Sequence, residues 1–247
     1  MIEYFEIRET LILTLFSLIS LKIANSNYFS LISFFLLFLG LQGLKNSLNY
    51  ELNRIYYPKK FKGEFHEAYK FSFLFLLLAL ITSYYFGYGH YFLLSIFSYF
   101  FAFFIKPKAS FFSDFIYFLS SLFTFSIPFQ LSPSLTHIPF LWTLSLILLL
   151  RKIVWDLIRP YGIENYNLPK MVGVKGARNA FYLICALSLL WLSMPALLNA
   201  SLYSSLYPIP FSFILLSSYL IATQRPNEAR NSLDLALFSY LIVSIFL

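Results

Sequence analysis

Apolar residues recur in nine runs along the chain, and short polar or basic stretches separate these runs. Several runs are shorter than the roughly 20 residues that a helix needs to cross a bilayer, so some helices must recruit flanking residues, and eight spans also fit the pattern. The pattern predicts an all-α protein with transmembrane helices over residues 7–24, 28–44, 69–85, 91–105, 111–129, 138–150, 180–198, 209–222 and 233–247.

The composition supports a membrane location. Of the 247 residues, 59% are hydrophobic and only 12% are charged, and the mean hydropathy is +0.72. A soluble domain of this length cannot enclose so much apolar surface in one core. We therefore predict an integral, multi-pass protein of the plasma membrane in which residues 1–247 form a single transmembrane domain.

Lys and Arg are distributed unevenly between the connections. Every even-numbered connection is basic and the odd-numbered ones lack Lys and Arg, so that all of the 18 basic residues except Lys22 fall on one side. By the positive-inside rule, the N-terminus and the even-numbered connections are cytoplasmic. The acidic amino terminus predicts that the first span is retained and is not a secretion signal. Because the positive charges are dispersed among membrane spans, nucleic acid is not expected as a partner.

The two longest polar connections follow the second and sixth runs, and four helices separate them. This spacing predicts two four-helix halves plus one further helix. In such a plan the binding site lies between the halves. We therefore expect a central cavity that opens to the cytoplasmic side.

Three asparagines at helical spacing end the second apolar run. Asn46, Asn49 and Asn53 are three and four residues apart, so on a helix they project from one face. Positive charge follows at once along the chain, from Arg54 to Lys60. The arrangement indicates a polar site at the cytoplasmic mouth of the second span.

These residues carry a family resemblance. The tract NSLNYELNRIYYPKKFKGEFHEA resembles the first signature of the UbiA superfamily of intramembrane prenyltransferases, in which aspartates stand at the three asparagine positions. The tract RKIVWDLIRPYGIENYNLPKMVGVKGA is similar to the second signature. In this tract Asp156 is the only family acid kept, and Arg159 and Ile163 occupy two other acidic positions.

A third likeness lies between the two signatures. Tyr99 and Lys106 resemble the Tyr and Lys that members of the family place beside the diphosphate, and Asp114 falls where the family commonly has Asn. The resemblance covers nearly the whole chain. It implies a nine-helix fold of the UbiA type.

The resemblance also implies a chemistry. Family members hold Mg²⁺ through the signature carboxylates, and the metal draws the diphosphate off an allylic isoprenoid so that an aromatic or hydroxyl acceptor traps the carbocation. Mg²⁺ prefers anionic oxygen, and neutral amides replace it poorly. The substitutions therefore predict that the chain binds an isoprenoid diphosphate or another anionic lipid and that none of its residues binds a metal ion. Mg²⁺ is expected as a cofactor only if the protein is an active enzyme.

The candidate site follows from this resemblance. Its catalytic candidates are Asp156, Tyr99 and Lys106. The candidates for substrate binding all carry an amide or a positive charge: Asn46, Asn49, Asn53, Arg54, Lys59, Lys60, Arg151 and Arg159. Fixed Lys and Arg side chains bind phosphate directly, and Arg does so with two parallel hydrogen bonds.

Each of these assignments has a structural alternative. The basic residues also serve to set the topology and to anchor lipid headgroups. For Asp156 the alternative is an ion pair with Arg159 or Arg151, because acids within a membrane normally have a partner.

Two functions are compatible with these features. In the first, the chain is a degenerate UbiA-like protein, a pseudoenzyme that binds a lipid. In the second, it is an active prenyltransferase that transfers a polyprenyl group to a lipid, quinone or glycerol-phosphate acceptor and uses its basic residues with Asp156. The first function is favoured, because Asp156 is the only signature acid that the chain keeps. Either function is compatible with a protein partner. A transporter is less well supported, because inverted repeats and midplane charges are lacking.

Overall fold

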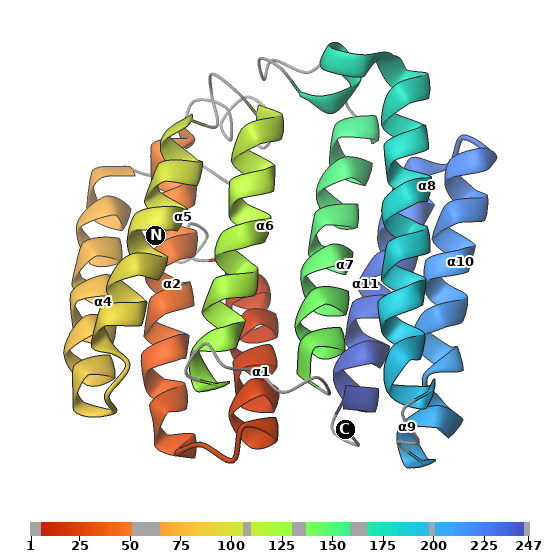
Figure 1. Ribbon diagram of the computed structural model, residues 1–247. Helices are drawn as coiled ribbons and strands as arrows, with labels where there is room; N and C mark the ends of the chain where they lie inside the picture. Colours follow the sequence, from red (N-terminus) through yellow and green to blue (C-terminus); the bar gives the residue numbers. More distant parts are fainter. Residues whose placement is uncertain are drawn as a thin grey trace. The chain divides into compact units, whose positions relative to one another are not determined.

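The computed structural model describes residues 6–50, 65–105, 110–129, 137–158, 167–197 and 201–244 (Figure 1). Within these residues there are nine α-helices of 15 or more residues and no strand. The chain divides into two compact units, Met1–Leu131 and Ser132–Leu247, which we call the first and second units. The prediction of an all-α fold is confirmed.

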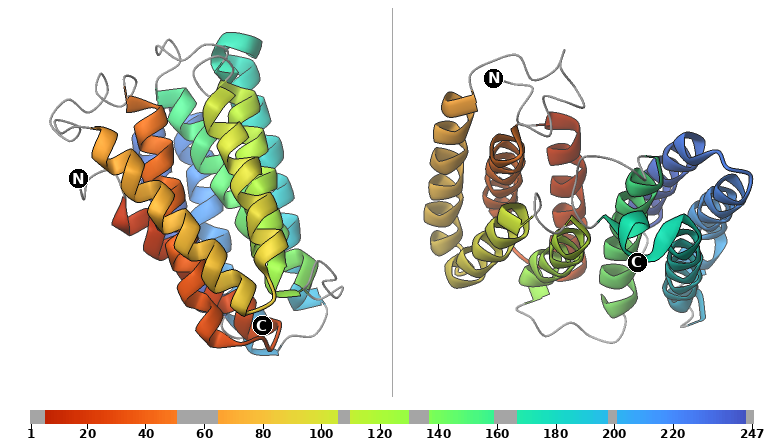
Figure 2. Two further views of the ribbon diagram at one scale, coloured as in Figure 1. Left: turned by 90° about the vertical axis from the view of Figure 1, so that its left-hand side faces the viewer. Right: turned by 90° about the horizontal axis from the view of Figure 1, so that it is seen from above.

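The first unit contains five of the long helices. They are α1 (Ile7–Ile23), α2 (Leu31–Leu48), α4 (Phe65–Tyr85), α5 (Gly89–Ile105) and α6 (Ser110–Ser126), with the 3-10 turns η2 (Tyr28–Ser30) and η3 (Ile127–Phe129). The helices alternate in direction, so the last turn of α2 and the first turn of α4 lie at the same end of the unit (Figure 1). Seen along the helices, α2 lies between α4 and α1 and packs against both (Figure 2).

The second unit contains the other four long helices and one short helix. These are α7 (His137–Ile158), α8 (Leu168–Leu197), α9 (Ser201–Leu206), α10 (Pro208–Ala222) and α11 (Pro226–Ser244). α7 packs against α8 and α11, and α10 packs against α11. The sequence predicts two four-helix halves plus one helix. In the structure the first unit has five long helices and the second has four, so the additional helix belongs to the first unit. That residues 1–247 form a single domain stays a prediction.

Several helices are long and apolar enough to cross a membrane. Among the described residues, five helical segments meet this criterion: Tyr28–Leu48, His66–Tyr85, Phe111–Phe129, Ile138–Ile158 and Leu168–Leu197. The helices α5 and α10 are apolar but shorter. These lengths agree with a multi-pass membrane protein.

Three helices extend by seven or more residues beyond the apolar runs that predict them, and α2 and α4 extend by four residues each. α7 continues past residue 150, α8 begins at Leu168 and α11 begins at Pro226. Lys and Arg allow such extensions because their stems lie along apolar surface while their charged ends reach the membrane interface. The following basic residues, which the sequence pattern assigned to connections, therefore lie in helices: Lys45, Lys70, Arg151, Lys152, Lys170, Lys175, Arg178 and Arg230.

The first turn of α8 is set apart from the rest of the helix. Gly173 has φ 74° and ψ 161°, a conformation that interrupts the helix and that side chains with a Cβ rarely adopt. The interruption is visible at the upper end of α8 in Figure 1. The segment before Gly173 therefore changes direction relative to the long apolar part of α8.

α2 and α4 approach closely at Gly40. A Cβ placed on Gly40 would lie 2.8 Å from Leu76 Cγ and 3.0 Å from the Ser72 carbonyl oxygen. In the same interface, Ser33 Oγ donates a hydrogen bond to Thr82 Oγ1 at 2.9 Å. Small residues allow membrane helices to pack at such short distances.

We expect Gly40→Val to lower the free energy of unfolding by about 1–3 kcal/mol, because its side chain forces the two helices apart. Titration of the detergent-solubilised protein with SDS measures this change. The double variant Gly40→Val, Leu76→Ala should recover part of the loss, since it removes the nearest opposing atoms. Equal stability of Gly40→Val and the unaltered protein would contradict this packing.

Candidate functional site

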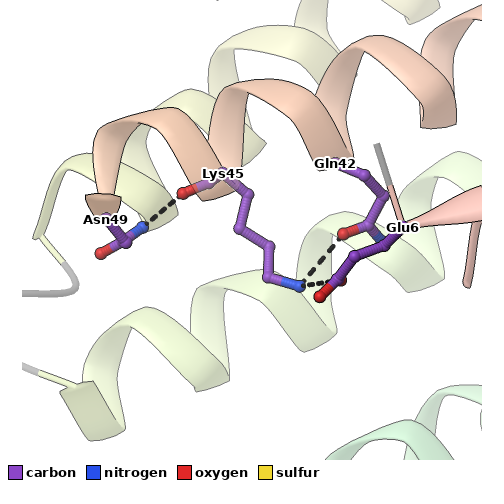
Figure 3. A network of polar contacts seen from close by, with 4 residues as sticks. All are labelled: Glu6, Gln42, Lys45 and Asn49. Atoms are coloured by element: carbon purple, nitrogen blue, oxygen red, sulfur yellow. Dashed lines mark hydrogen bonds and ion pairs between the residues drawn. The ribbon is translucent and has the colours of Figure 1, made fainter. Parts of the chain in front are cut away.

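Two of the predicted asparagines lie at the C-terminal end of α2. Asn46 is in the last turn of the helix and is 2% exposed, whereas Asn49 follows the helix as its C-cap and is 7% exposed. Asn49 Nδ2 donates a hydrogen bond to the Lys45 carbonyl oxygen at 2.8 Å (Figure 3). α2 ends at Leu48, so Asn49 lies just beyond the helix; Asn53 lies outside the described residues, and the expectation that the three asparagines share one helix face stays a prediction.

The hydrogen bond of Asn49 gives a physical reason for an amide at this position. The Lys45 carbonyl oxygen accepts the backbone N–H of Asn49 at 3.1 Å, and the side-chain amide of Asn49 gives the same oxygen a second donor. An ionised carboxylate accepts hydrogen bonds but has none to donate. Within the described part of the chain, Asn49 Oδ1 is buried and has no hydrogen-bond partner. Asn49 thus closes the helix with its nitrogen and leaves its oxygen as an acceptor.

Lys45 lies one helical turn before Asn49 and is held by two side chains. Its Nζ donates to Gln42 Oε1 at 3.0 Å and forms an ion pair with Glu6 Oε2 at 3.2 Å (Figure 3). The side chains of Lys45 and Glu6 are 24% and 22% exposed. This network joins the residue that precedes α1 to the last turn of α2.

Tyr99 is buried between α5 and α6. It is 1% exposed, and its hydroxyl donates a hydrogen bond to Ser121 Oγ at 3.0 Å. Its ring meets Tyr117 edge to face at 5.2 Å and stacks on Phe103 at 6.0 Å between ring centres. Asp114, also on α6, is buried as well. The hydroxyl proton of Tyr99 is therefore committed to a protein partner, and its catalytic role stays a prediction.

Asp156 is buried in the last turn of α7 and reaches the start of α8. Its Oδ2 accepts a hydrogen bond from the Leu168 backbone N–H at 3.1 Å. Next to it, Asn167 Oδ1 accepts from the Lys170 backbone N–H at 3.0 Å. Carboxylate and amide oxygens at a helix N-terminus satisfy free N–H groups there, and the negative charge is favoured. Asp156 therefore links the end of α7 to the beginning of α8.

Arg151, a predicted phosphate ligand, lies beside an acid that the sequence analysis did not identify. Arg151 Nε is 2.7 Å from Asp234 Oδ1 on α11, and the side chains are 13% and 17% exposed. One turn away on both helices, the Arg230 guanidinium lies over the Trp155 ring at 4.8 Å from its centre. The position of Asp234 within the ninth apolar run was a signal in the sequence that this residue has a partner, because acids within a membrane normally have one.

The other candidates lie outside the described residues. They are Asn53, Arg54, Lys59, Lys60, Lys106 and Arg159. Of the described candidates, Asn46 and Asn49 come together at the end of α2, and Tyr99 lies on α5 of the same unit. Arg151 and Asp156 share the last turns of α7 in the second unit.

The two asparagines at the end of α2 do not fit a Mg²⁺ site by themselves. Asn46 and Asn49 offer neutral amides, and the nitrogen of Asn49 is bound to a backbone carbonyl. In the described ranges, no group of three or more His, Cys, Asp or Glu side chains is placed to hold a metal ion. Mg²⁺ binds hard, preferably anionic oxygen ligands, which this donor set lacks.

No sequence-family model and no curated protein matches the chain. Solved structures match it over nearly their whole length. A digeranylgeranylglyceryl phosphate synthase structure has a TM-score of 0.74 and 16% identity, with 99% of this chain and 97% of that chain covered. A UbiA homologue from Aeropyrum pernix K1 in its apo form has a TM-score of 0.72 and 14% identity, with 97% and 98% covered.

A third structure is a UbiA homologue from Archaeoglobus fulgidus bound to GPP and Mg²⁺. It has a TM-score of 0.69 and 13% identity, with 98% of this chain and 97% of that chain covered. The same fold thus recurs in several proteins of low sequence identity. The resemblance read from the signatures is confirmed for the fold: this chain has the fold of the UbiA homologues.

Proposed function

We propose that this chain binds an isoprenoid diphosphate through fixed Lys and Arg side chains and does not carry out Mg²⁺-dependent prenyl transfer. The observation that carries this proposal is the hydrogen bond from Asn49 Nδ2 to the Lys45 carbonyl oxygen. At this position the resemblance implies a carboxylate, yet the chain uses a donor that a carboxylate lacks. The end of α2 is therefore suited to an amide and not to an ionised acid.

The ligand class is supported by the fold and by the charge. UbiA homologues from Archaeoglobus fulgidus have been solved with GPP and with DMAPP, in each case with Mg²⁺. This chain carries a formal net charge of +7, and Lys and Arg follow both signature tracts. An isoprenoid diphosphate combines an apolar chain, which suits a membrane protein, with a phosphate group that Lys and Arg bind directly.

A resident metal is not required in this arrangement. In related enzymes the positive charge near the diphosphate comes from Mg²⁺, whereas here Arg159 stands at one of the acidic positions. We infer that fixed cations take over the electrostatic part of binding. Removal of divalent ions is then expected to leave the affinity unchanged.

The second candidate is an active transferase that acts on a lipid, quinone or glycerol-phosphate acceptor. The observation that favours it is the buried carboxylate of Asp156, the family acid that the chain keeps. One oxygen of this carboxylate accepts a hydrogen bond from the start of α8, so the group also has a structural use.

Binding and transfer assays on the full chain in nanodiscs distinguish the two. We expect geranylgeranyl or farnesyl diphosphate to bind equally well with Mg²⁺ and with EDTA, and we expect no prenyl product with any acceptor. Geranylgeraniol, which lacks the diphosphate, is the matched control and should bind more weakly. Prenyl transfer that requires Mg²⁺ would show that the second candidate is right.

A further inference from the structure

The ammonium group of Lys45 already binds an anion, the carboxylate of Glu6. Nζ lies 3.2 Å from Glu6 Oε2 and 3.0 Å from Gln42 Oε1, so one charged and one neutral oxygen hold it (Figure 3). Lys45 and Asn49 are four residues apart, which places Lys45 one turn below the asparagine that closes the helix. The side chain of Lys45 runs from the last turn of α2 toward Gln42 and Glu6, away from Asn49 (Figure 3).

Glu6 reaches Lys45 from an unusual backbone conformation. Its φ of 39° and ψ of 60° lie in the left-handed region, which residues other than glycine adopt only when their surroundings stabilise it. Its carbonyl oxygen accepts the hydrogen bond from Thr10 N that begins α1. Its side chain makes no cap hydrogen bond to that helix. The carboxylate is thus directed to Lys45 instead of serving as the cap of α1.

This ion pair is suited to exchange. Both side chains are more than a fifth exposed, and ion pairs with access to water contribute little to stability. A phosphate group carries more negative charge than a carboxylate and has more acceptor oxygens, so it competes well for an ammonium group. Gln42 remains as a partner that holds Lys45 in place when the anion changes.

We propose that Lys45 binds the phosphate headgroup of the ligand and that the Glu6 carboxylate occupies this position until a ligand displaces it. The inference rests on the proposed function, because it requires that the ligand carry a phosphate or diphosphate group. Glu6 then acts as an internal competitor. It sets the affinity for the ligand without contributing to its binding.

The test compares Glu6→Gln with the unaltered chain in nanodiscs, using geranylgeranyl diphosphate, inorganic pyrophosphate and geranylgeraniol as probes. Removal of the competing charge should tighten the binding of geranylgeranyl diphosphate by about fivefold, a factor typical of a partly exposed ion pair. If Glu6→Gln also binds pyrophosphate more tightly, the phosphate is the group that Lys45 binds. If only geranylgeranyl diphosphate binds more tightly, the isoprenoid chain is needed to hold the diphosphate at Lys45. Geranylgeraniol binding should not change.

Two further variants separate this effect from a general change in charge. Glu67→Gln removes an exposed carboxylate from the first turn of α4, which lies at the same end of the first unit, and should leave all affinities unchanged. Lys45→Met should weaken binding of the diphosphate, and Glu6→Gln should have no further effect in that variant. Glu6→Asp shortens the reach of the carboxylate, so its affinity for geranylgeranyl diphosphate should lie between those of the unaltered chain and Glu6→Gln. This variant replaces Glu6→Gln in the test if the latter folds poorly.

The possible failures are distinguishable. If the unaltered chain binds geranylgeranyl diphosphate and Glu6→Gln binds it no more tightly, the role of Glu6 is wrong and the proposed function stands. If tightening persists in the Lys45→Met variant, Lys45 is not the point of competition. If neither the unaltered chain nor Glu6→Gln binds a diphosphate, the proposed function fails and this inference fails with it.

Discussion

Replacement of Asp234 by alanine is expected to lower the free energy of unfolding by about 3–5 kcal/mol. Asp234 Oδ1 lies 2.7 Å from Arg151 Nε, and both side chains are largely buried. Without the carboxylate, the guanidinium group keeps its charge in a site that offers little water. This cost is greater within a membrane than at a soluble surface. SDS titration of the detergent-solubilised variant measures the loss.

The packing of α7 against α11 provides the control. Asp234 and Arg230 are four residues apart on α11, and they meet Arg151 and Trp155, which are four residues apart on α7. Because the two helices run in opposite directions, these two contacts lie one helical turn apart along the interface between α7 and α11. The exchanged pair Arg151→Asp, Asp234→Arg should therefore regain most of the stability that Asp234→Ala loses.

An exposed pair shows how large the effect of burial is. Glu228 lies 3.1 Å from Arg225, and the two side chains are 50% and 59% exposed. Glu228→Ala is expected to change the free energy of unfolding by less than about 1 kcal/mol. If Asp234→Ala is as mild as Glu228→Ala, the pair between α7 and α11 is not desolvated.

The exchanged pair also tests the predicted role of Arg151 in phosphate binding. If Arg151 contacts the diphosphate, the exchanged variant should be stable and yet bind geranylgeranyl diphosphate weakly, because the positive charge has moved to α11. If Arg151 serves only to join the two helices, the exchanged variant should bind as well as the unaltered chain. Stability and affinity thus report on different roles of the same residue.

The apolar pattern predicts where the helices lie but not where they end. The run over residues 180–198 marks only the most apolar part of α8, which begins at Leu168. An apolar run reports the part of a helix that suits lipid, whereas caps fix its ends. Asn167 and Asp156 supply such caps at the start of α8, through contacts that depend on the folded chain.

The partner of Arg151 illustrates a second limit. Because acids within a membrane normally have a partner, Arg151 and Arg159 were the predicted partners of Asp156, and Asp234 was not among the candidate residues. In the structure Arg151 is paired with Asp234, because α7 and α11 are neighbours. Hydropathy and charge in one sequence predict that a buried acid needs a partner, but they do not say which helices meet.

The candidate site was predictable in part. The signature resemblance placed Asn46 and Asn49 at the end of the second span, and the structure has both there. What the sequence could not show is the use of the Asn49 amide as a donor to Lys45, because this depends on α2 ending at Leu48. The chemistry of the site therefore follows from a helix boundary that the hydrophobic pattern leaves undetermined.

Asn49→Asp is expected to lower the free energy of unfolding by about 2 kcal/mol in buffer without divalent ions. The ionised side chain cannot donate to the Lys45 carbonyl oxygen, so that carbonyl loses its side-chain donor. The new negative charge also lies at the C-terminal end of a helix, where the helix dipole disfavours it. Thermal unfolding with EDTA measures the loss, and a drop in stability together with loss of diphosphate binding is the expected result.

Asn49→Ala separates the two causes, because it removes the donor without adding a charge, and it should be less destabilised than Asn49→Asp. Restoring acids at all four positions, with Asp at 46, 49, 53 and 159, should create a site that Mg²⁺ stabilises if the resemblance places these residues together. The unaltered chain should show no such response to Mg²⁺, because its amides carry no charge to attract the ion. Stabilisation of the unaltered chain by Mg²⁺ to the same extent as the four-acid variant would mean that the amides hold a metal after all, and that the hydrogen bond from Asn49 to the backbone gives way to it.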